Sequence, residues 1–216
     1  RCPSHPVAIE LLKAVGVPVA APSANRFGKV SPTRASHVMD ELQGRIAYVL
    51  DGEVPAIGIE STIVSLLGEK PAVLRPGAIT AQQLEQVLGC AVISHAQAQS
   101  QIGNPRVSGA LEKHYSPDAK VLVVDPEWFK SMDALQADHS LIVGWTLPFL
   151  QAADAFLGKN GVDIMALEDD SQAVAKVLYG ILRNADEKGY TRIVVESPSD
   201  NPHWEGVADR LRRASA

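Results

Sequence analysis

In the first ninety residues, apolar positions come in short runs that turn-forming residues separate. After His5-Pro6, apolar residues with helical spacing predict a helix over residues 4–16 that ends at a glycine. The apolar runs at residues 17–21 and 46–50 predict two short strands. Between them, a serine followed by proline predicts an N-cap and a helix over residues 31–44.

The next segment has the pattern of a β-hairpin followed by a helix. Residues 61–67 and 72–74 predict the two strands, and Gly68-Glu69-Lys70-Pro71 predicts their connection. Thr80 and Gln83 have the spacing of a capping box, which predicts a helix that ends at Gly89. A first domain is therefore predicted over residues 1–90.

The remainder divides into an irregular stretch and an alternating α/β pattern. Residues 94–118 mix Gln, Ser, Gly and Pro without sustained periodicity, which predicts a linker over residues 91–118. After it, strand and helix patterns alternate, which is typical of a small parallel, Rossmann-like α/β domain over residues 119–216. The predicted elements are strands at 120–124, 141–144 and 193–196, and helices at 172–184 and 206–213.

Composition narrows the class of protein. The 216 residues are 46% hydrophobic, with no apolar run near the roughly 20 residues that cross a bilayer, so no membrane partner is expected. Cys2 and Cys90 make no disulfide framework, which favours a reducing, cytoplasmic location. Lys and Arg balance Asp and Glu at 8 each over residues 1–89, whereas residues 90–216 carry 12 basic and 17 acidic side chains. This distribution gives no overall attraction for nucleic acid.

The first residue is Arg1, and a Pro-rich turn and a helix follow with no strand before them. We therefore expect a fragment that begins inside a domain.

The loop AAPSANRFGKVSPT, residues 20–33, is the first candidate site. In an open α/β sheet, loops that leave the carboxyl ends of strands line the ligand crevice. Ser23 and Asn25 offer a hydroxyl and an amide for phosphate, and Ser31 stands at a predicted helix start that favours anions. Alternatively, Ser23 and Asn25 satisfy a tight turn and Ser31 only caps the helix.

Other candidates lie at strand ends and in the linker. Arg75 follows an apolar run and precedes Pro-Gly, so its guanidinium could bind phosphate or carboxylate, or form a surface salt bridge. Ser61 could contact a ligand or stabilise its own turn, and Tyr115 could cover a nucleotide or anchor the linker. The six histidines are dispersed, and no metal ligand from the protein is predicted.

Several motifs together resemble one family. RCPSHP, AAPSAN with SPT, GIESTIV and LRPGAIT occur in the order of the C-terminal half of the YrdC-like domain, a twisted open sheet. PRVSG with HYSP resembles the linker of the two-domain threonylcarbamoyl-AMP synthases, and VES with ADRLRRASA resembles the end of their second domain.

The resemblance implies a nucleotidyltransferase that makes threonylcarbamoyl-AMP and diphosphate from L-threonine, bicarbonate and ATP, with Mg²⁺ accompanying the ATP. The product would serve threonylcarbamoyladenosine formation in tRNA, through a downstream transferase complex. The resemblance assigns threonine to Arg1, Ala21 and Ser61, ATP to Ser23, Ser31, Arg75 and Tyr115, and part of a catalytic polar tetrad to Ser23 and Asn25. The second domain would act through the linker as a lid.

The same resemblance implies that the N-terminal half of the catalytic domain is missing, so we expect this chain to be inactive alone, with a poorly stable first domain. Three alternatives stay open: a YrdC-like domain for carbamoyl transfer in hydrogenase maturation, a YrdC-like double-stranded RNA-binding module without catalysis, and a regulatory or interaction role for residues 119–216.

Overall fold

The structure is a computed structural model that describes residues 3–53, 55–102, 107, 114–136 and 138–216. We call residues 3–102 the N-terminal part and residues 114–216 the C-terminal part. Within the described ranges, no helix has the length and apolar character needed to cross a membrane.

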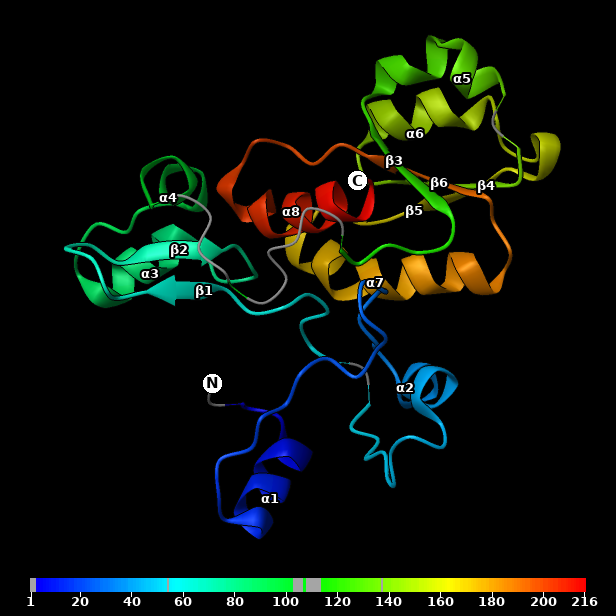
Figure 1. Cartoon of the computed structure of the whole chain (residues 1–216). Coiled ribbons are helices and arrows are strands. Elements are labelled where there is room, and N and C mark those ends of the chain that lie inside the picture. The colour runs from blue at the N-terminus through cyan, green and yellow to red at the C-terminus, as the bar shows by residue number, and fades with distance from the viewer. Residues whose placement is uncertain (1–2, 54, 103–106, 108–113, 137) are drawn as a thin grey trace.

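A four-stranded parallel sheet forms the centre of the C-terminal part (Figure 1). Its order is β3 (Lys120–Val124), β6 (Arg192–Glu196), β4 (Ser140–Gly144) and β5 (Asp163–Ala166). Every residue of β4 is buried, as expected for a strand inside a parallel sheet with both faces covered. The parallel α/β architecture predicted for this region is confirmed.

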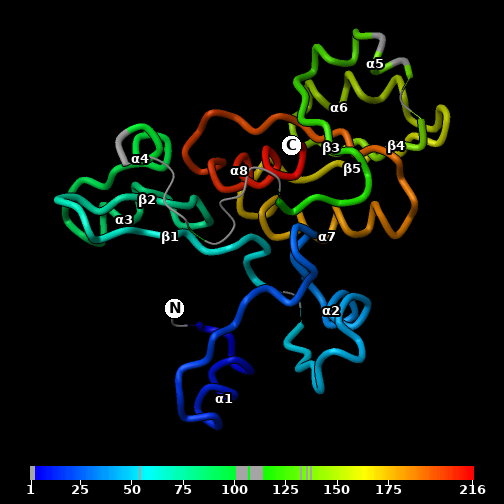
Figure 2. Tube along the Cα trace, viewed as in Figure 1, coloured from blue at the N-terminus to red at the C-terminus, as the bar shows by residue number. Residues whose placement is uncertain are grey.

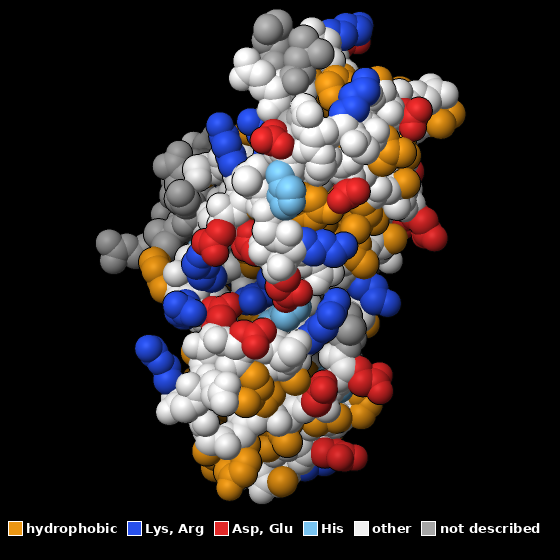
Figure 3. All heavy atoms as spheres, turned by 90° about the vertical axis from the view of Figure 1, so that its right-hand side faces the viewer, with side chains coloured by type: hydrophobic (Ala, Val, Ile, Leu, Met, Phe, Trp, Pro, Cys, Tyr) orange, Lys and Arg blue, Asp and Glu red, His pale blue; other side chains and the backbone are white. Residues whose placement is uncertain are grey.

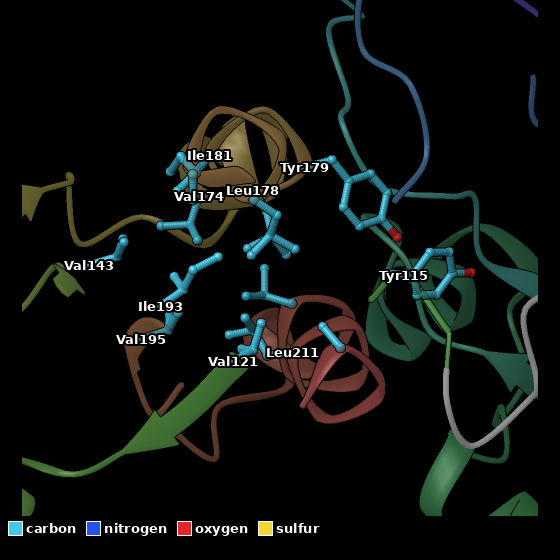
Figure 4. Packing of buried hydrophobic residues seen from close by; sticks show 14 of the residues in the cluster. Tyr115, Val121, Val143, Val174, Leu178, Tyr179, Ile181, Ile193, Val195 and Leu211 are labelled. Atoms are coloured by element: carbon cyan, nitrogen blue, oxygen red, sulfur yellow. The ribbon is translucent and has the colours of Figure 1, made fainter. Parts of the chain in front are cut away.

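Helices cover both faces of this sheet. The helices α7 (Ser171–Glu187) and α8 (Glu205–Ala214) pack on one face, where Val121, Val143 and Ile193 point (Figure 4). The other face packs residues of η1 (Pro126–Lys130) and α6 (Leu147–Asp154) against Ile142 and Val194, and α5 (Met132–Leu135) contacts η1. Neighbouring strand residues thus point to opposite faces. Two short 3₁₀ segments, η2 (Lys159–Gly161) and η3 (Pro202–Trp204), complete the C-terminal part.

The predicted helix at 172–184 is α7, and its buried residues recur at helical spacing: Val174, Ala175, Leu178, Tyr179, Ile181, Leu182 and Ala185. The predicted helix at 206–213 is α8, and the three predicted strands are β3, β4 and β6. The sequence did not predict β5 and α6, both of which are short.

The N-terminal part contains helices α1 (Pro6–Val15), α2 (Ala35–Leu42), α3 (Ala81–Leu88) and α4 (His95–Ile102), and the antiparallel hairpin of β1 (Ile63–Ser65) and β2 (Ala72–Arg75). The predicted hairpin is therefore confirmed, with a shorter first strand. The capping box of Thr80 and Gln83 is also confirmed at the start of α3. The tube in Figure 2 shows the hairpin and its two helices beside α8, whereas α1 and α2 lie apart from the sheet.

The strands predicted at 17–21 and 46–50 are wrong, because neither segment is a strand in the structure. Extended backbone needs a neighbour to satisfy its amide and carbonyl groups, and no described residue pairs with either segment in a ladder. Their apolar side chains are exposed: Val17, Val19, Ile46, Tyr48 and Leu50. In Figure 3, hydrophobic side chains gather at the lower end of the molecule, at the level of α1 in Figure 1.

Two further predictions need correction. The helix predicted from Ser31 begins at Ala35, with Arg34 as N-cap, so Ser31 does not cap it. The stretch predicted as irregular from residue 94 contains α4, which packs on β2, and Ala98 is buried in that contact. Its sequence HAQAQSQI has little apolar periodicity, which is why the helix escaped prediction.

Glycines allow the two parts of the chain to approach closely. A Cβ on Gly58 would lie 2.2 Å from the carbonyl oxygen of Lys176 in α7, and a Cβ on Gly206 in α8 would lie 2.8 Å from that of Gly77. Main chain therefore packs directly on main chain at this interface. The segments on either side of Gly58 and Gly77 carry the candidate site residues.

Candidate functional site

A buried carboxylate joins both parts of the chain beneath the candidate residues. Glu60 Oε1 accepts from the hydroxyl of Ser31 at 2.8 Å, and Oε2 accepts from the hydroxyl of Tyr179 at 2.7 Å and from Arg210 Nε at 2.9 Å. We call these four residues the Glu60 cluster. Because a carboxylate only accepts, Ser31 must use its single proton on Glu60.

The arginine of this cluster is fully buried and has several partners. Arg210 Nη1 donates to the carbonyl oxygen of Pro76 at 2.8 Å and to Asp209 Oδ2 at 2.9 Å, and Nη2 donates to the carbonyl oxygen of Glu60 at 3.1 Å. Arg213 also donates to Asp209, at 3.0 Å. A buried charge is tolerated only when it is paired and hydrogen-bonded in this way.

The electrostatics of the cluster keep Glu60 ionised. Burial raises the pKa of Glu60, but the charge of Arg210 and the hydrogen bonds from Tyr179 and Ser31 lower it more, so the pKa lies below its usual value. Burial and the negative charge of Glu60 raise the pKa of the Tyr179 phenol well above its usual value. The phenol therefore stays protonated and donates.

Tyr115 of HYSP packs against this cluster. Its side chain is 1% exposed, and its ring stacks on that of Tyr179 with 5.3 Å between centroids (Figure 4). The guanidinium carbon of Arg210 lies 5.7 Å from the centroid of the Tyr115 ring, within cation–π range. The φ of Tyr115 is 60°, an uncommon left-handed value that this packing maintains. Tyr115 is thus anchored against α7 and α8 beside the Glu60 cluster.

Arg75 and Ser61 are brought together by the hairpin. Arg75 ends β2, is 1% exposed, and donates from Nε and Nη2 to the carbonyl oxygen of Ser61 at 3.2 and 2.8 Å. The residue Ser61 is exposed. The structure therefore gives Arg75 a role in aligning the GIEST segment and leaves the side chain of Ser61 directed to solvent.

The loop of residues 20–33 contacts the Glu60 cluster through Ser31, near its end. Ala21 and Ser23 are exposed, and within the described residues no hydrogen bond joins either of them to the Glu60 cluster. Asn25 donates its amide to the carbonyl oxygens of Arg26 and Lys29 at 2.8 and 3.1 Å, and its buried Oδ1 has no hydrogen-bond partner in the described part of the chain. Asn25 therefore serves its own loop and still offers one acceptor. Arg1 lies outside the described residues.

The segment after HYSP is tied to the same loop. Ser116 N donates to the carbonyl oxygen of Gly28 at 3.1 Å, and Lys29 forms an exposed ion pair with Asp118 at 2.5 Å. A pocket of about 220 Å³ opens here, and Arg26, Lys29 and Arg183 are among the residues that line it. Arg183 of α7 also holds this loop, since it donates to the carbonyl oxygens of Val30 and Ser31 and pairs with Glu41.

A family model described as "Threonylcarbamoyl-AMP synthase, C-terminal domain" matches residues 79–216. The chain belongs to the threonylcarbamoyl-AMP synthase family. A second family model, described as "Telomere recombination", matches residues 1–77. The resemblance carried by the sequence motifs is thereby confirmed.

Similar proteins cover the whole chain. The threonylcarbamoyl-AMP synthase of Bacillus subtilis (strain 168) is 35% identical over all of this chain, and that of Pyrococcus abyssi (strain GE5 / Orsay) is 32% identical. A crystal structure of P. abyssi Sua5 complexed with L-threonine superposes with a TM-score of 0.80 and 29% identity, covering 100% of this chain and 63% of that one. The chain spans 62% and 63% of the length of the two relatives.

Three residues of the Glu60 cluster were not predicted from the sequence: Glu60, Tyr179 and Arg210. Glu60 stands in the GIEST motif, where the family resemblance assigned a role only to its neighbour Ser61. Tyr179 has the spacing of a core position on α7, and Arg210 lies among charged residues that are typical of a solvated helix face. Tyr179 lies 119 residues and Arg210 lies 150 residues after Glu60 in the sequence. No local pattern reveals contacts over such separations.

Proposed function

We propose that the protein forms threonylcarbamoyl-AMP and diphosphate from L-threonine, bicarbonate and ATP. The observation that carries this proposal is the placement of Arg75, which ends β2 on the carbonyl of Ser61, in a chain similar throughout to a Sua5 structure complexed with L-threonine. The chemistry of these side chains suits a carboxylate substrate and a polyphosphate substrate side by side.

The proposed roles follow the family motifs. Arg1 and Ser61, with the main chain of Ala21, bind threonine, and Ser23, Ser31, Arg75 and Tyr115 bind ATP. Asn25 contributes to the catalytic polar group together with Ser23, and its Oδ1, which has no partner among the described residues, supports a polar contact there. The exposed Ser23 and Ser61 stay accessible to a ligand, whereas Ser31 and Arg75 act from buried positions.

The reaction needs positioning more than a protein nucleophile. The amine of threonine condenses with bicarbonate to a carbamate with loss of water, and a carbamate oxygen then attacks the α-phosphorus as the bond to diphosphate breaks. Several negative charges meet in this step, so cationic and hydrogen-bonding groups that are already in place lower its barrier. Arg75 supplies such a cation on a rigid strand end.

Mg²⁺ is proposed as a partner of ATP rather than a resident metal. The described residues contain no group of three or more His, Cys, Asp or Glu side chains that could bind a metal ion. Mg²⁺ at phosphoryl-transfer sites is bound largely by substrate phosphates and water, so its binding with ATP does not need a cluster of protein ligands. The positive charge of Mg²⁺ would offset the negative charge of the phosphates.

The product is a mixed carbamic–phosphoric anhydride, which needs a transferase to pass the threonylcarbamoyl group to tRNA. We propose such a transferase complex as the downstream partner, a cytoplasmic location, and direct RNA contact only as a transient encounter, since the charge of the chain gives no basic footprint.

The test measures diphosphate release from ATP in the complete product of the gene, with and without L-threonine and bicarbonate. Release that depends on both is expected. Loss of one hydrogen bond in Ser61→Ala should raise the KM for threonine about fivefold with little effect on the KM for ATP.

Ser199→Ala is the matched control, because Ser199 is also exposed but lies in the C-terminal part beyond β6. It should match the unaltered protein. Absence of any threonine-dependent diphosphate release from the complete gene product would refute the proposed function.

A further inference from the structure

Arg210 contacts both segments that carry candidate ligand residues. Its Nη2 donates to the carbonyl oxygen of Glu60 at 3.1 Å, one residue before Ser61, and its Nη1 donates to that of Pro76 at 2.8 Å, one residue after Arg75. One guanidinium group from α8 therefore spans the GIEST segment and the end of β2.

These two segments are already joined at the neighbouring residues. Arg75 donates twice to the carbonyl oxygen of Ser61. Arg210 adds hydrogen bonds to the main chain just before Ser61, at Glu60, and just after Arg75, at Pro76. The planar, rigid geometry of two guanidinium groups thus sets the separation of Ser61 from Arg75.

Arg210 also reaches the other candidate residues for ATP. Its ion pair with Glu60 keeps that carboxylate ionised, and the carboxylate orients the hydroxyl of Ser31 at 2.8 Å. Its guanidinium carbon lies 5.7 Å from the centroid of the Tyr115 ring. Ser31 and Tyr115 therefore have their positions fixed by one side chain of the C-terminal part.

We propose that Arg210 is the positioning residue of this site, through which the C-terminal part aligns Ser31, Arg75 and Tyr115 for ATP and the neighbouring Ser61 for threonine. This inference rests on the proposed function for what the site binds. Arg210 is fully buried and donates from Nε, Nη1 and Nη2 to groups of the chain itself, so it acts on the site through other residues.

The contacts distinguish positioning from simple charge neutralisation. A lysine at position 210 would keep a positive charge near Glu60, because its side chain ends in an ammonium group. That group carries its three donors on a flexible stem. It has no planar fork that reaches the carbonyl oxygens of Glu60 and Pro76 together. Arg210→Lys therefore removes alignment and retains the charge.

The experiment compares Arg210→Lys with Arg212→Lys. Arg212 lies on the same helix, also donates to Asp209, at 3.0 Å, and has a half-exposed side chain, so it makes a matched control. Amide hydrogen exchange is measured on the 216-residue chain. The KM for ATP and kcat are measured on the complete product of the gene.

We expect Arg210→Lys to speed exchange at least tenfold in peptides covering residues 59–63 and 73–78. It should also raise the KM for ATP at least tenfold, with a smaller fall in kcat. Arg212→Lys should stay within twofold of the unaltered protein in both measurements. Wild-type exchange and a wild-type KM in Arg210→Lys would overturn the proposal.

A second variant covers the case in which Arg210→Lys does not fold. In Glu60→Gln/Arg210→Met the carboxylate of Glu60 is gone and Asp209 keeps its pair with Arg213, so no unpaired charge remains. Positioning predicts that this folded double variant keeps a raised KM for ATP and fast exchange, and recovery of wild-type values would overturn it. If the unaltered protein shows no threonine-dependent diphosphate release, the proposed function fails. The exchange measurement then still decides whether Arg210 fixes the two segments.

Discussion

Replacing Glu196 at the end of β6 should separate the effect of losing a charge from the effect of losing an acceptor. Glu196 is 4% exposed, and its Oε2 accepts from the amides of Trp145 and Thr146 at 2.6 and 2.9 Å. Its Oε1 accepts from the hydroxyl of Thr146. Thr146 is the N-cap of α6, so the carboxylate lies at the positive end of that helix.

The magnitudes follow from what each variant leaves behind. In Glu196→Gln, the amide oxygen can still accept from both main-chain donors, and the threonine hydroxyl can turn to accept from the new amide group. The charge at the helix end is lost, which costs about 1–2 kcal/mol. Glu196→Ala leaves two amides and a hydroxyl without an acceptor in a buried place, which should cost about 3–5 kcal/mol.

Urea unfolding followed by tryptophan fluorescence measures these costs. All three tryptophans, Trp128, Trp145 and Trp204, lie in the C-terminal part, so the signal reports on the region that contains Glu196. Glu127→Gln is the control, because Glu127 forms an exposed ion pair with Lys130 and should change stability by less than about 0.5 kcal/mol. Equal losses in Glu196→Gln and Glu196→Ala, or no loss in Glu196→Ala, would refute the reasoning.

Three further predictions concern the interface and the loop. Gly206→Ala brings a Cβ within 2.8 Å of the carbonyl oxygen of Gly77, so it should lower the free energy of unfolding by about 1–3 kcal/mol; unchanged urea unfolding would contradict this. Burial raises the pKa of Glu60, but its ion pair and hydrogen bonds lower it below its usual 4.5. Its stabilising contribution is therefore full above pH 4.5 and is lost as pH falls through the lower folded-state pKa, so Glu60→Gln should flatten the acid limb of stability against pH; an unaltered limb would show that this carboxylate does not contribute. Lys29→Met breaks an exposed ion pair with Asp118 and should change thermal stability by less than about 0.5 kcal/mol; a larger loss would show that this pair is stronger than its exposure implies.

Local patterns were sufficient for three strands and the long helix of the C-terminal part, but not for β5 and α6. The strands β3, β4 and β6 and the helix α7 each carry their apolar period within a few residues, so the sequence alone predicted them. A strand, however, also needs a neighbour. The apolar residues at 17–21 and 46–50 have the pattern of strands, but no residue that the structure describes pairs with them and neither segment is a strand.

The sequence predicted only those residues of the candidate site that lie in family motifs, and not the partners that they contact. The resemblance identified Ser31, Ser61, Arg75 and Tyr115, and the structure brings these four to the Glu60 cluster or to its immediate neighbours. Serine before proline is typical of an N-cap and predicted that role for Ser31, yet the Ser31 hydroxyl donates to the carboxylate of Glu60, 29 residues away. Long-range pairing of this kind has no local signature.

The separation of Glu60 from Arg210 has a consequence for how the protein is made. The two residues are 150 positions apart, and Arg210 lies in α8, the last helix of the chain. On the ribosome, Glu60 emerges long before its counter-charge is synthesised. Until α8 has emerged and docked, the GIEST segment holds a carboxylate that must stay hydrated. Co-translational folding should therefore leave this segment open and protease-sensitive until α8 has emerged and docked.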